Sequence, residues 1–363
     1  MKPTLRFSSL LLAAVLVLTV GVAIAFRAAA ADPAKGISAA SQAVRDKIDL
    51  KAPDGCRHIY GFNYQPSWGY NGLTVWGAKF DPAKYRQELA AGKKYFPKFN
   101  AVRMWLSWSA YRANPVRFVR NFQQAVDICG ELDLLVVPVI FNRWTGNPLW
   151  DRVENPELAA PFDATFGPFI RALVVPRKGD LRILAWDLCN EPYNDAATMA
   201  VETQWLTKVR QSVKQCDPAA LCCIGTMPGV DHLTRCGHLQ DILTPHLYVP
   251  LYDFPPRSRP AKLQDTLVPL SLVAESAKMA KKLGKPMISS ECCWGAEDDA
   301  ERVSIVRTNL QALKQYQIGF FPHALYTSGV ADLHKYKEGL YMPFILEDGS
   351  LRPGHEVYNE FAQ

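Results

Sequence analysis

The sequence has no long run of like charge and only a small excess of basic over acidic residues. Among its 363 residues, 41 Lys and Arg oppose 35 Asp and Glu, which leaves a net charge of +6 at pH 7. Proteins that bind nucleic acids usually cluster their basic residues, so we expect no nucleic-acid partner. A disordered chain is excluded as well, because 48% of the residues are hydrophobic and only 21% are charged.

Motifs that would define several other enzyme classes are missing. No G-x-G-x-x-G pattern follows the first expected strand, which weakens a nucleotide-binding interpretation, and no G-x-S-x-G pattern indicates a serine nucleophile. There is no C-x-x-C pair, and His355-Glu356 begins a zinc-binding H-E-x-x-H motif that Asn359 leaves incomplete. We therefore expect neither a metal nor another cofactor.

Long hydrophobic runs are scarce, and the run at residues 10–25 follows two basic residues near the start of the chain. This arrangement is typical of a secretory signal peptide, here residues 1–31, with cleavage after Ala25 or after Ala30 or Ala31. We predict a secreted or periplasmic protein without a stable membrane partner. The alternative is an uncleaved anchor, although a membrane-spanning helix normally needs about 20 apolar residues.

The nine cysteines are an odd number, so a monomer in an oxidising compartment would keep at least one free thiol. Cys129 falls on an expected helix face and Cys189 on an expected strand, and we interpret both as small buried residues. Four others lie close enough in sequence to form a local disulfide: Cys216, Cys222, Cys223 and Cys236.

Short apolar runs that are typical of buried parallel strands alternate with helical patterns along the rest of the chain. Eight strands are expected, at residues 58–63, 100–105, 134–141, 182–190, 221–225, 241–248, 286–291 and 318–326. Asp81-Pro82 and Asn114-Pro115 are helix start signals. Further helices are expected over residues 196–214, 265–283, 298–315 and 355–361.

Eight strand–helix units fit a single-domain (β/α)8 barrel better than an open doubly wound sheet, which usually has five or six strands. No linker rich in Gly, Ser or Pro divides this part of the chain. We predict a pre-barrel segment over residues 32–54, one barrel domain over residues 55–363, and a monomer.

The active sites of such barrels lie in the loops after the carboxyl ends of the strands. Polar side chains occupy these positions at most of the expected strands: Asn63, Arg103, Asn190, Glu191, His246, Tyr248, Glu291 and His323. Glu191 and Glu291 end the fourth and seventh strands, so they are expected to face each other across the mouth of the barrel.

Two opposed carboxyl groups are the minimum equipment for glycoside hydrolysis, in which one protonates the leaving oxygen and the other attacks the anomeric carbon. Arg103 and Tyr248 are expected to keep Glu291 ionised, whereas Glu191 has no cation beside it in sequence and retains its proton. Asn190 can bind the sugar 2-hydroxyl. A single glutamate at a strand end is more often a helix cap or a surface charge, and only the combination indicates this chemistry.

These residues resemble, in their order along the chain, the retaining glycoside hydrolases of clan A, and most closely the cellulase and mannanase group of family 5. The resemblance covers residues 58–361 and is carried by three motifs: Asn190-Glu191-Pro192, His246-x-Tyr248 and Glu291. It implies that Glu191 is the acid/base and Glu291 the nucleophile, with Arg103, Asn190, His246 and Tyr248 in support.

Two positions depart from the pattern that this resemblance implies. Family 5 enzymes commonly carry a histidine after the third strand, where this chain has Phe141-Asn142-Arg143. They also commonly carry a tryptophan on the eighth strand, where this chain has Pro322-His323. We expect His323 and Asn63 to take part in substrate binding.

Nine tryptophans exceed what a core needs, and seven lie in expected loops: Trp68, Trp76, Trp105, Trp108, Trp144, Trp150 and Trp294. Aromatic rings offer flat apolar surfaces to sugar rings, and we expect Trp105, Trp144 and Trp294 to contact substrate. Trp186 and Trp205 are expected in the core.

The sequence thus predicts a secreted retaining β-glycosidase that hydrolyses a β-linked poly- or oligosaccharide of the β-glucan or β-mannan type. Two alternatives are a catalytically inactive carbohydrate-binding barrel, which would need neither glutamate, and a transglycosylase with the same residues. Loop shape, which motifs do not specify, decides the sugar and whether cleavage is internal or terminal.

Overall fold

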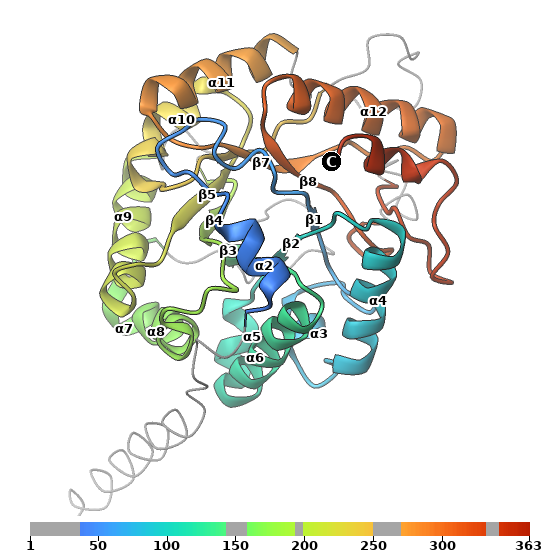
Figure 1. Cartoon of the computed structure of the whole chain (residues 1–363). Helices are drawn as coiled ribbons and strands as arrows, with labels where there is room; N and C mark the ends of the chain where they lie inside the picture. Colours follow the sequence, from blue (N-terminus) through green and yellow to red (C-terminus); the bar gives the residue numbers. More distant parts are fainter. Residues whose placement is uncertain (1–36, 143–157, 193–198, 250–269, 332–340) are drawn as a thin grey trace, which may run out of the picture.

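A computed structural model describes residues 37–142, 158–192, 199–249, 270–331 and 341–363. The expected signal peptide, Trp144 and Trp150 lie outside these residues. Parallel strands form a ring that helices surround on the outside (Figure 1). The strands are β1 (Gly61–Asn63), β2 (Ala101–Trp105), β3 (Leu135–Asn142), β4 (Trp186–Asn190), β5 (Cys222–Thr226), β6 (Thr244–Pro245), β7 (Ile288–Cys292) and β8 (Gly319–Pro322).

The ring is closed by single bridges between its two sheets. Strands β1 to β6 pair in sequence order and β7 pairs with β8, all in parallel. Parallel bridges between His246 and Glu291 join β6 to β7, and those between Asn63 and His323 join β8 to β1. The predicted (β/α)8 barrel is therefore confirmed, and each expected strand overlaps an observed one, although β3, β5 and β7 end one residue later than expected.

The two Asx-Pro signals begin the helices that they predict. Asp81 accepts hydrogen bonds from two backbone amides at the start of α4 (Pro82–Tyr95), and Asn114 accepts one at the start of α6 (Pro115–Glu131). Such caps satisfy amides that have no partner within the helix.

The remaining helical elements include five short helices that lie outside the expected ranges, namely α3, α5, α7, α8 and α10, and two 3₁₀ turns, η3 and η4. The expected terminal helix over 355–361 is a 3₁₀ helix, η8. Their bounds are α3 (Gly72–Trp76), α5 (Trp108–Ala113), α7 (Phe162–Thr165), α8 (Gly167–Val174), η3 (Val175–Arg177), α9 (Met199–Cys216), α10 (Val230–Cys236), η4 (Gly237–Leu239), α11 (Leu270–Leu283), α12 (Asp299–Gln315) and η8 (His355–Glu360).

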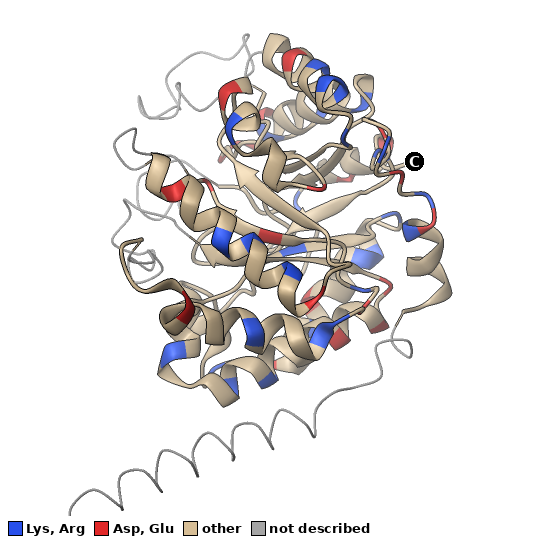
Figure 2. Cartoon of the chain, turned by 90° about the vertical axis from the view of Figure 1, so that its left-hand side faces the viewer, with Lys and Arg blue, Asp and Glu red and all other residues tan. Residues whose placement is uncertain are grey.

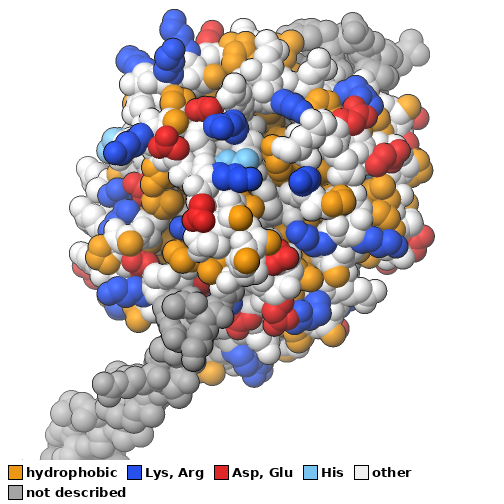
Figure 3. Space-filling model, in the orientation of Figure 1, with side chains coloured by type: hydrophobic (Ala, Val, Ile, Leu, Met, Phe, Trp, Pro, Cys, Tyr) orange, Lys and Arg blue, Asp and Glu red, His pale blue; other side chains and the backbone are white. Residues whose placement is uncertain are grey.

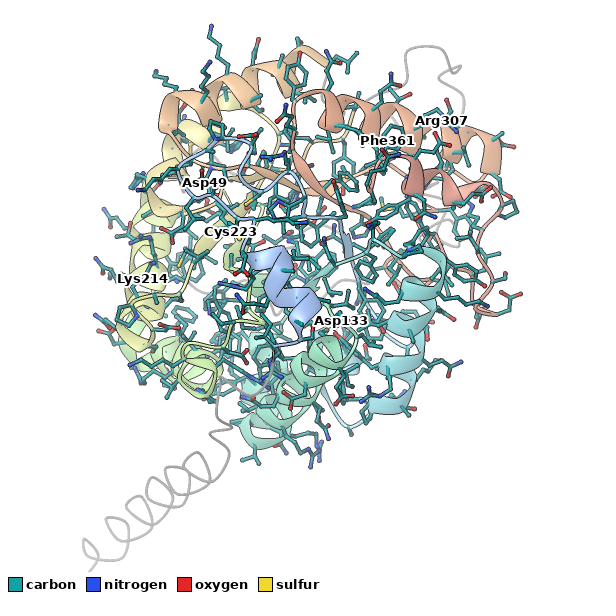
Figure 4. All side chains as sticks on the ribbon, in the orientation of Figure 1. Asp49, Asp133, Lys214, Cys223, Arg307 and Phe361 are labelled. Atoms are coloured by element: carbon teal, nitrogen blue, oxygen red, sulfur yellow. The ribbon has the colours of Figure 1, made fainter. Side chains whose placement is uncertain are left out.

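Two hydrophobic clusters hold the barrel together. The larger one lies between the strands and the helices, and includes the buried face of α6 and both Trp186 and Trp205, as expected. The smaller one fills the interior of the ring, where Cys223 of β5 lies (Figure 4). All nine cysteines are free thiols, so the local disulfide considered for residues 216–236 is not formed. Cys129 and Cys189 are buried, as predicted.

The segment before the barrel closes its amino-terminal end. Helix α2 (Ala39–Arg45) lies across the ring in Figure 1, and Ile37, Val44 and Ile48 pack on the interior cluster. Arg45 Nη1 donates a 2.9 Å hydrogen bond to the Ile183 carbonyl. The domain boundary at residue 55 stays a prediction.

Charged residues lie mainly on the outer helices and loops (Figure 2). On the face seen in Figure 3, acidic and basic side chains are interspersed with apolar ones. No helix among the described residues has the length and apolar character that crossing a membrane requires.

Candidate active site

Arg103 organises the carboxyl end of the barrel. Its side chain is fully buried on β2 and donates from Nε to Asp187 at 3.0 Å, from Nη1 to Asn63 at 3.0 Å and to Glu291 at 2.7 Å, and from Nη2 to Asn190 at 2.8 Å. A guanidinium has five N–H donors in a rigid fork, and four side chains from three other strands, β1, β4 and β7, share them. The expected gathering of these residues at one face is observed.

Glu291 receives a hydrogen bond on each carboxylate oxygen. Oε1 accepts from Arg103, and Oε2 accepts from the Tyr248 hydroxyl at 2.7 Å. One donor is a fixed cation, and charge-assisted hydrogen bonds are about twice as strong as neutral ones. The two donors fix the orientation of the Glu291 carboxylate.

Glu191 lies in a different environment. Burial raises its pKa from the usual 4.5 to about 7, against the opposing effects of Arg103 and His232. Its backbone has a φ of 44°, in the left-handed region that non-glycine residues rarely adopt, and its amide donates to the Gly225 carbonyl at 2.6 Å. Such backbone conformations cluster at functional sites.

His246 lies between the two glutamates. Its Nδ1 is 2.6 Å from Glu191 Oε1 and 3.5 Å from Glu291 Oε2. Burial lowers the pKa of its imidazole to about 4, so it is neutral near pH 7. One nitrogen of His246 and one oxygen of each glutamate lie within 4.8 Å of one another.

These three residues are also the described group whose spacing could hold a metal ion. The Arg103 guanidinium, 2.7 Å from Glu291, already supplies a positive charge there and would repel a cation. Proton transfer suits this cluster better than metal binding. The expectation of no metal stays a prediction.

Several expected substrate contacts are buried inside the protein. Both donors of Asn63 Nδ2 are used by the carbonyls of Ser290 and Phe321, at 2.8 Å each. Arg103 and His246 have no exposed surface. We interpret Asn63, Arg103 and His246 as positioning residues. Asn190 accepts from Arg103 at Oδ1, and none of the described residues accepts a hydrogen bond from its two amide donors.

The aromatic residues divide into core and site. Trp76 and Trp108 are buried, and Trp76 Nε1 donates to the Trp105 carbonyl at 2.8 Å. Trp105 is half-buried, and its ring lies 5.4 Å from that of His323. Trp294 is half-buried, and its ring packs edge-on against that of Tyr248, with 5.1 Å between the ring centres. It therefore lies beside a residue that binds Glu291.

Three residues near the site were not anticipated. Asp187 of β4 points into the barrel and accepts a hydrogen bond from Arg103. The alternation of side chains along a strand could have revealed this placement. Gly225 leaves room for the cluster, because a Cβ there would lie 2.6 Å from Arg103 Nη2 and 2.7 Å from His246 Nε2. His232 of α10 interacts electrostatically with Glu191. No sequence signal marks His232, since α10 was not expected.

Comparison with protein-family models identifies the chain. The model for Cellulase (glycosyl hydrolase family 5) matches residues 61–327, which include every strand and both glutamates. The chain belongs to glycosyl hydrolase family 5. This family 5 protein is a glycoside hydrolase of the clan A type, and the resemblance drawn from its sequence is confirmed.

Solved structures show the same fold as this family 5 hydrolase. The exo-beta-1,4-mannosidase Op5Man5 from Opitutaceae bacterium strain TAV5 has a TM-score of 0.66 and 18% identity, and the match covers 84% of this chain and 59% of that one. The endo-beta-1,4-mannanase from Thermotoga petrophila has a TM-score of 0.60 and 14% identity, and the match covers 84% of this chain and 76% of that one. GH5_18 from Streptomyces cattleya in complex with GlcNAc has a TM-score of 0.64 and 14% identity, and the match covers 86% of this chain and 80% of that one.

At these identities the similarity shows the fold alone, and this chain spans 59% of the length of the mannosidase. A comparison with curated protein sequences gives no match.

Proposed function

We propose that this family 5 hydrolase is a secreted retaining β-glycosidase that cleaves a β-linked poly- or oligosaccharide by double displacement. One observation carries the proposal: a single neutral imidazole, His246, lies between two carboxyl groups whose surroundings differ. Glu291 has a guanidinium and a phenol as donors, whereas burial favours the protonated form of Glu191. Opposite preferences of this kind separate a nucleophile from an acid.

Glu191 is the proposed acid/base. His246 donates from Nδ1 to Glu191 Oε1, which leaves Oε2 to carry the proton toward the glycosidic oxygen. With a pKa of about 7, Glu191 is largely protonated in mildly acidic solution, as the first step requires. In the second step the resulting carboxylate takes a proton from water, which attacks the glycosyl-enzyme.

Glu291 is the proposed nucleophile, and its carboxylate attacks the anomeric carbon as the leaving group departs. Retaining enzymes hold their two carboxyl groups about 5–5.5 Å apart, and inverting enzymes about 6.5–9.5 Å. Oxygens of Glu191 and Glu291 lie within 4.8 Å of each other. The spacing therefore supports the covalent route and leaves little room for an intervening water.

The proposed substrate is a polymer or oligomer of the β-glucan or β-mannan type. The names of two structural neighbours, a mannosidase and a mannanase, favour the mannan side of this pair. The amide donors of Asn190 are placed to bind a sugar 2-hydroxyl, a contact that strengthens in the transition state.

The stereochemistry of the first product tests the double displacement. The purified mature protein is screened on β-mannans, β-glucans and aryl β-glycosides, and the best substrate is followed by NMR before mutarotation. We expect the β-anomer first. An initial α-anomer would show an inverting mechanism and overturn the proposed role of Glu291. Sugar transferred to added acceptors rather than to water would indicate a transglycosylase.

Azide rescue tests the acid/base. Glu191→Ala should slow substrates with poor leaving groups by about 10²- to 10⁴-fold, and activated aryl glycosides far less in the first step. Azide should accelerate this variant and yield a β-glycosyl azide. Glu88→Ala is the matched control, because it removes another buried carboxyl that is bound by Tyr64 and Ser67 rather than by Arg103 or His246. Equal azide effects on both variants would refute the assignment.

Secretion is tested on the expressed full-length chain. Amino-terminal sequencing of exported protein should show a start after Ala25, Ala30 or Ala31. Membrane-bound protein that keeps residues 1–31 would support the anchor instead.

A further inference from the structure

His323 is held rigidly at the carboxyl end of the barrel, beside the strand that carries Glu291. It follows β8, and its amide donates to the Cys292 carbonyl at 3.0 Å. Its own carbonyl accepts from Arg302 Nη2 at 2.8 Å. Cys292 is the residue after Glu291, so this hydrogen bond fixes the backbone of His323 relative to the proposed nucleophile.

The contact with Met342 determines which ring nitrogen of His323 carries the proton. Nδ1 lies 2.8 Å from Met342 Sδ. A thioether sulfur can only accept a hydrogen bond, so Nδ1 must be the donor. Burial, helped by the charges of Arg103 and Arg302, lowers the pKa of His323 to about 3. A neutral imidazole that donates from Nδ1 has an unprotonated acceptor at Nε2.

This acceptor is open to a ligand. Nε2 has no hydrogen-bond partner among the described residues, and His323 keeps 8% of its surface exposed. By contrast, Nε2 of His246 and Nε2 of His355 are completely enclosed. The ring of His323 lies edge-on to Trp105, whose indole nitrogen faces Asn190 Oδ1 at 3.5 Å.

We propose that His323 is a specificity-determining residue: its Nε2 accepts a hydrogen bond from a hydroxyl group of the sugar bound beside Glu291. The enzyme then selects sugars with a free hydroxyl at that position over sugars in which it is missing or blocked by acylation or alkylation. This inference rests on the proposed function. It adds to that function a chemical requirement that the two glutamates do not impose.

Deoxy analogues test the hydrogen bond directly. The parent is whichever aryl β-mannoside, β-glucoside or corresponding disaccharide the mature enzyme cleaves best, and kcat/KM is measured on the parent and on its monodeoxy analogues. For one analogue, the ratio of parent to analogue should be about 10- to 100-fold higher in the wild type than in His323→Phe. Phenylalanine keeps an aromatic ring but has no acceptor. His323→Gln, which offers a carbonyl oxygen, should recover part of the discrimination.

Met342→Leu tests the tautomer without touching the imidazole. Leucine retains the apolar volume but removes the sulfur acceptor, so the proton is free to move to Nε2. Nitrogen NMR of histidine-labelled enzyme should show an unprotonated Nε2 in the wild type and a larger share of protonated Nε2 in the variant. The same deoxy discrimination should fall by at least about threefold. A purely structural histidine would show neither linked change.

The outcomes separate this inference from the proposed function. If no parent substrate is cleaved, or if Glu291→Gln does not reduce cleavage, the proposed function fails and the role of His323 fails with it. If cleavage depends on Glu291 but the ratios for all analogues are the same in the wild type and the His323 variants, only the role of His323 is overturned. Should His323→Phe fail to fold, His323→Gln and Met342→Leu decide the question.

Discussion

The two ends of the barrel are built on the same strands from opposite kinds of side chain. On β2 the interior residue changes from Ala101 to Arg103, and at β4 it changes from Ala185, just before the strand, to Asp187 within it. Residues two apart on a strand point to the same side, so one step along the barrel axis replaces an apolar layer by a charged one. Stability is concentrated at one end, and chemistry at the other.

The polar end depends on matched partners and space rather than on hydrophobic burial. Arg103 has carboxylates on two sides, Asp187 at 2.9 Å and Glu291 at 2.7 Å. A buried charge without a partner costs several kcal/mol, so each member constrains the others. Gly225 permits this density, because no other residue would leave Arg103 and His246 in place. The apolar end, covered by α2, has no comparable constraint.

Substitutions in strand β7 test most sharply whether activity depends on one end of the barrel and stability on the other. Glu291→Gln should lower kcat/KM by about 10⁴-fold or more, because glutamine cannot form the glycosyl-enzyme. The free energy of unfolding should fall by about 3 kcal/mol at most, because Arg103 keeps its carboxylate partner Asp187. Intact-protein mass spectrometry with a slow substrate should detect a covalent adduct only in the wild type. An adduct on the variant would remove Glu291 as the nucleophile.

Ile288, three residues earlier on β7, is the counterpart at the apolar end. Ile288→Ala should reduce the free energy of unfolding by about 3 kcal/mol, since it opens a cavity in the interior cluster. Activity of the folded fraction at 25 °C should stay within about twofold of the wild type. Denaturant unfolding and kcat/KM on the same sample measure both. A large loss of activity without loss of stability would show that the ends are not separable.

The same Asp→Asn substitution can be compared in two buried Asp–Arg pairs, one at the site and one before β4. Asp187→Asn leaves Glu291 as the remaining described carboxylate partner of Arg103. It should cost about 3 kcal/mol of stability and about 10- to 100-fold in kcat/KM through misplacement of Glu291. Asp180→Asn removes a carboxylate that binds Arg182 at 2.8 Å and Arg177 at 3.0 Å before β4. It should also lower stability but leave kcat/KM unchanged. Equal kinetic losses would contradict the proposed positioning role of Asp187.

The pH dependence follows from the raised pKa of Glu191. The protonated carboxyl stabilises the fold fully below its ordinary value of 4.5, and this contribution is lost as the pH rises through about 7. Glu191→Gln has no such loss, so its stability relative to the wild type should increase from pH 5 to pH 8. In the wild type, kcat/KM should fall about tenfold per pH unit well above 7. A flat profile up to pH 9 would exclude Glu191 as the acid.

The smallest effect is expected at the closure of the apolar end. Arg45→Ala removes the hydrogen bond from α2 to the Ile183 carbonyl and should lower the free energy of unfolding by about 1 kcal/mol. Activity should not change. Arg57→Ala, which breaks an exposed ion pair with Asp54, is the control and should have almost no effect on stability. Identical results for the two variants would mean that α2 contributes little to closure.

The eight strands and the helix starts could be predicted because they depend on neighbours in sequence. The Asp81 side chain caps its helix by accepting hydrogen bonds from the backbone amides two and three residues later. Apolar runs recur wherever a strand is covered on both faces. Helices α7, α8 and α10 begin without a side-chain cap, so no capping signal in the sequence marks their starts. The short helices α3 and α5 do have caps, Asn71 and Ser107, that were not recognised as helix starts.

The main members of the site were predictable from the sequence, but most of the contacts between them were not. The order of polar strand ends by itself determined that Arg103, Glu191, His246 and Glu291 meet at one face. Only the tertiary structure decided that Arg103 also binds Asp187, that His246 lies between the glutamates, and that Met342 fixes the tautomer of His323. Protonation depends on burial and on partners that are distant in sequence, so it is determined only when the fold brings those groups together.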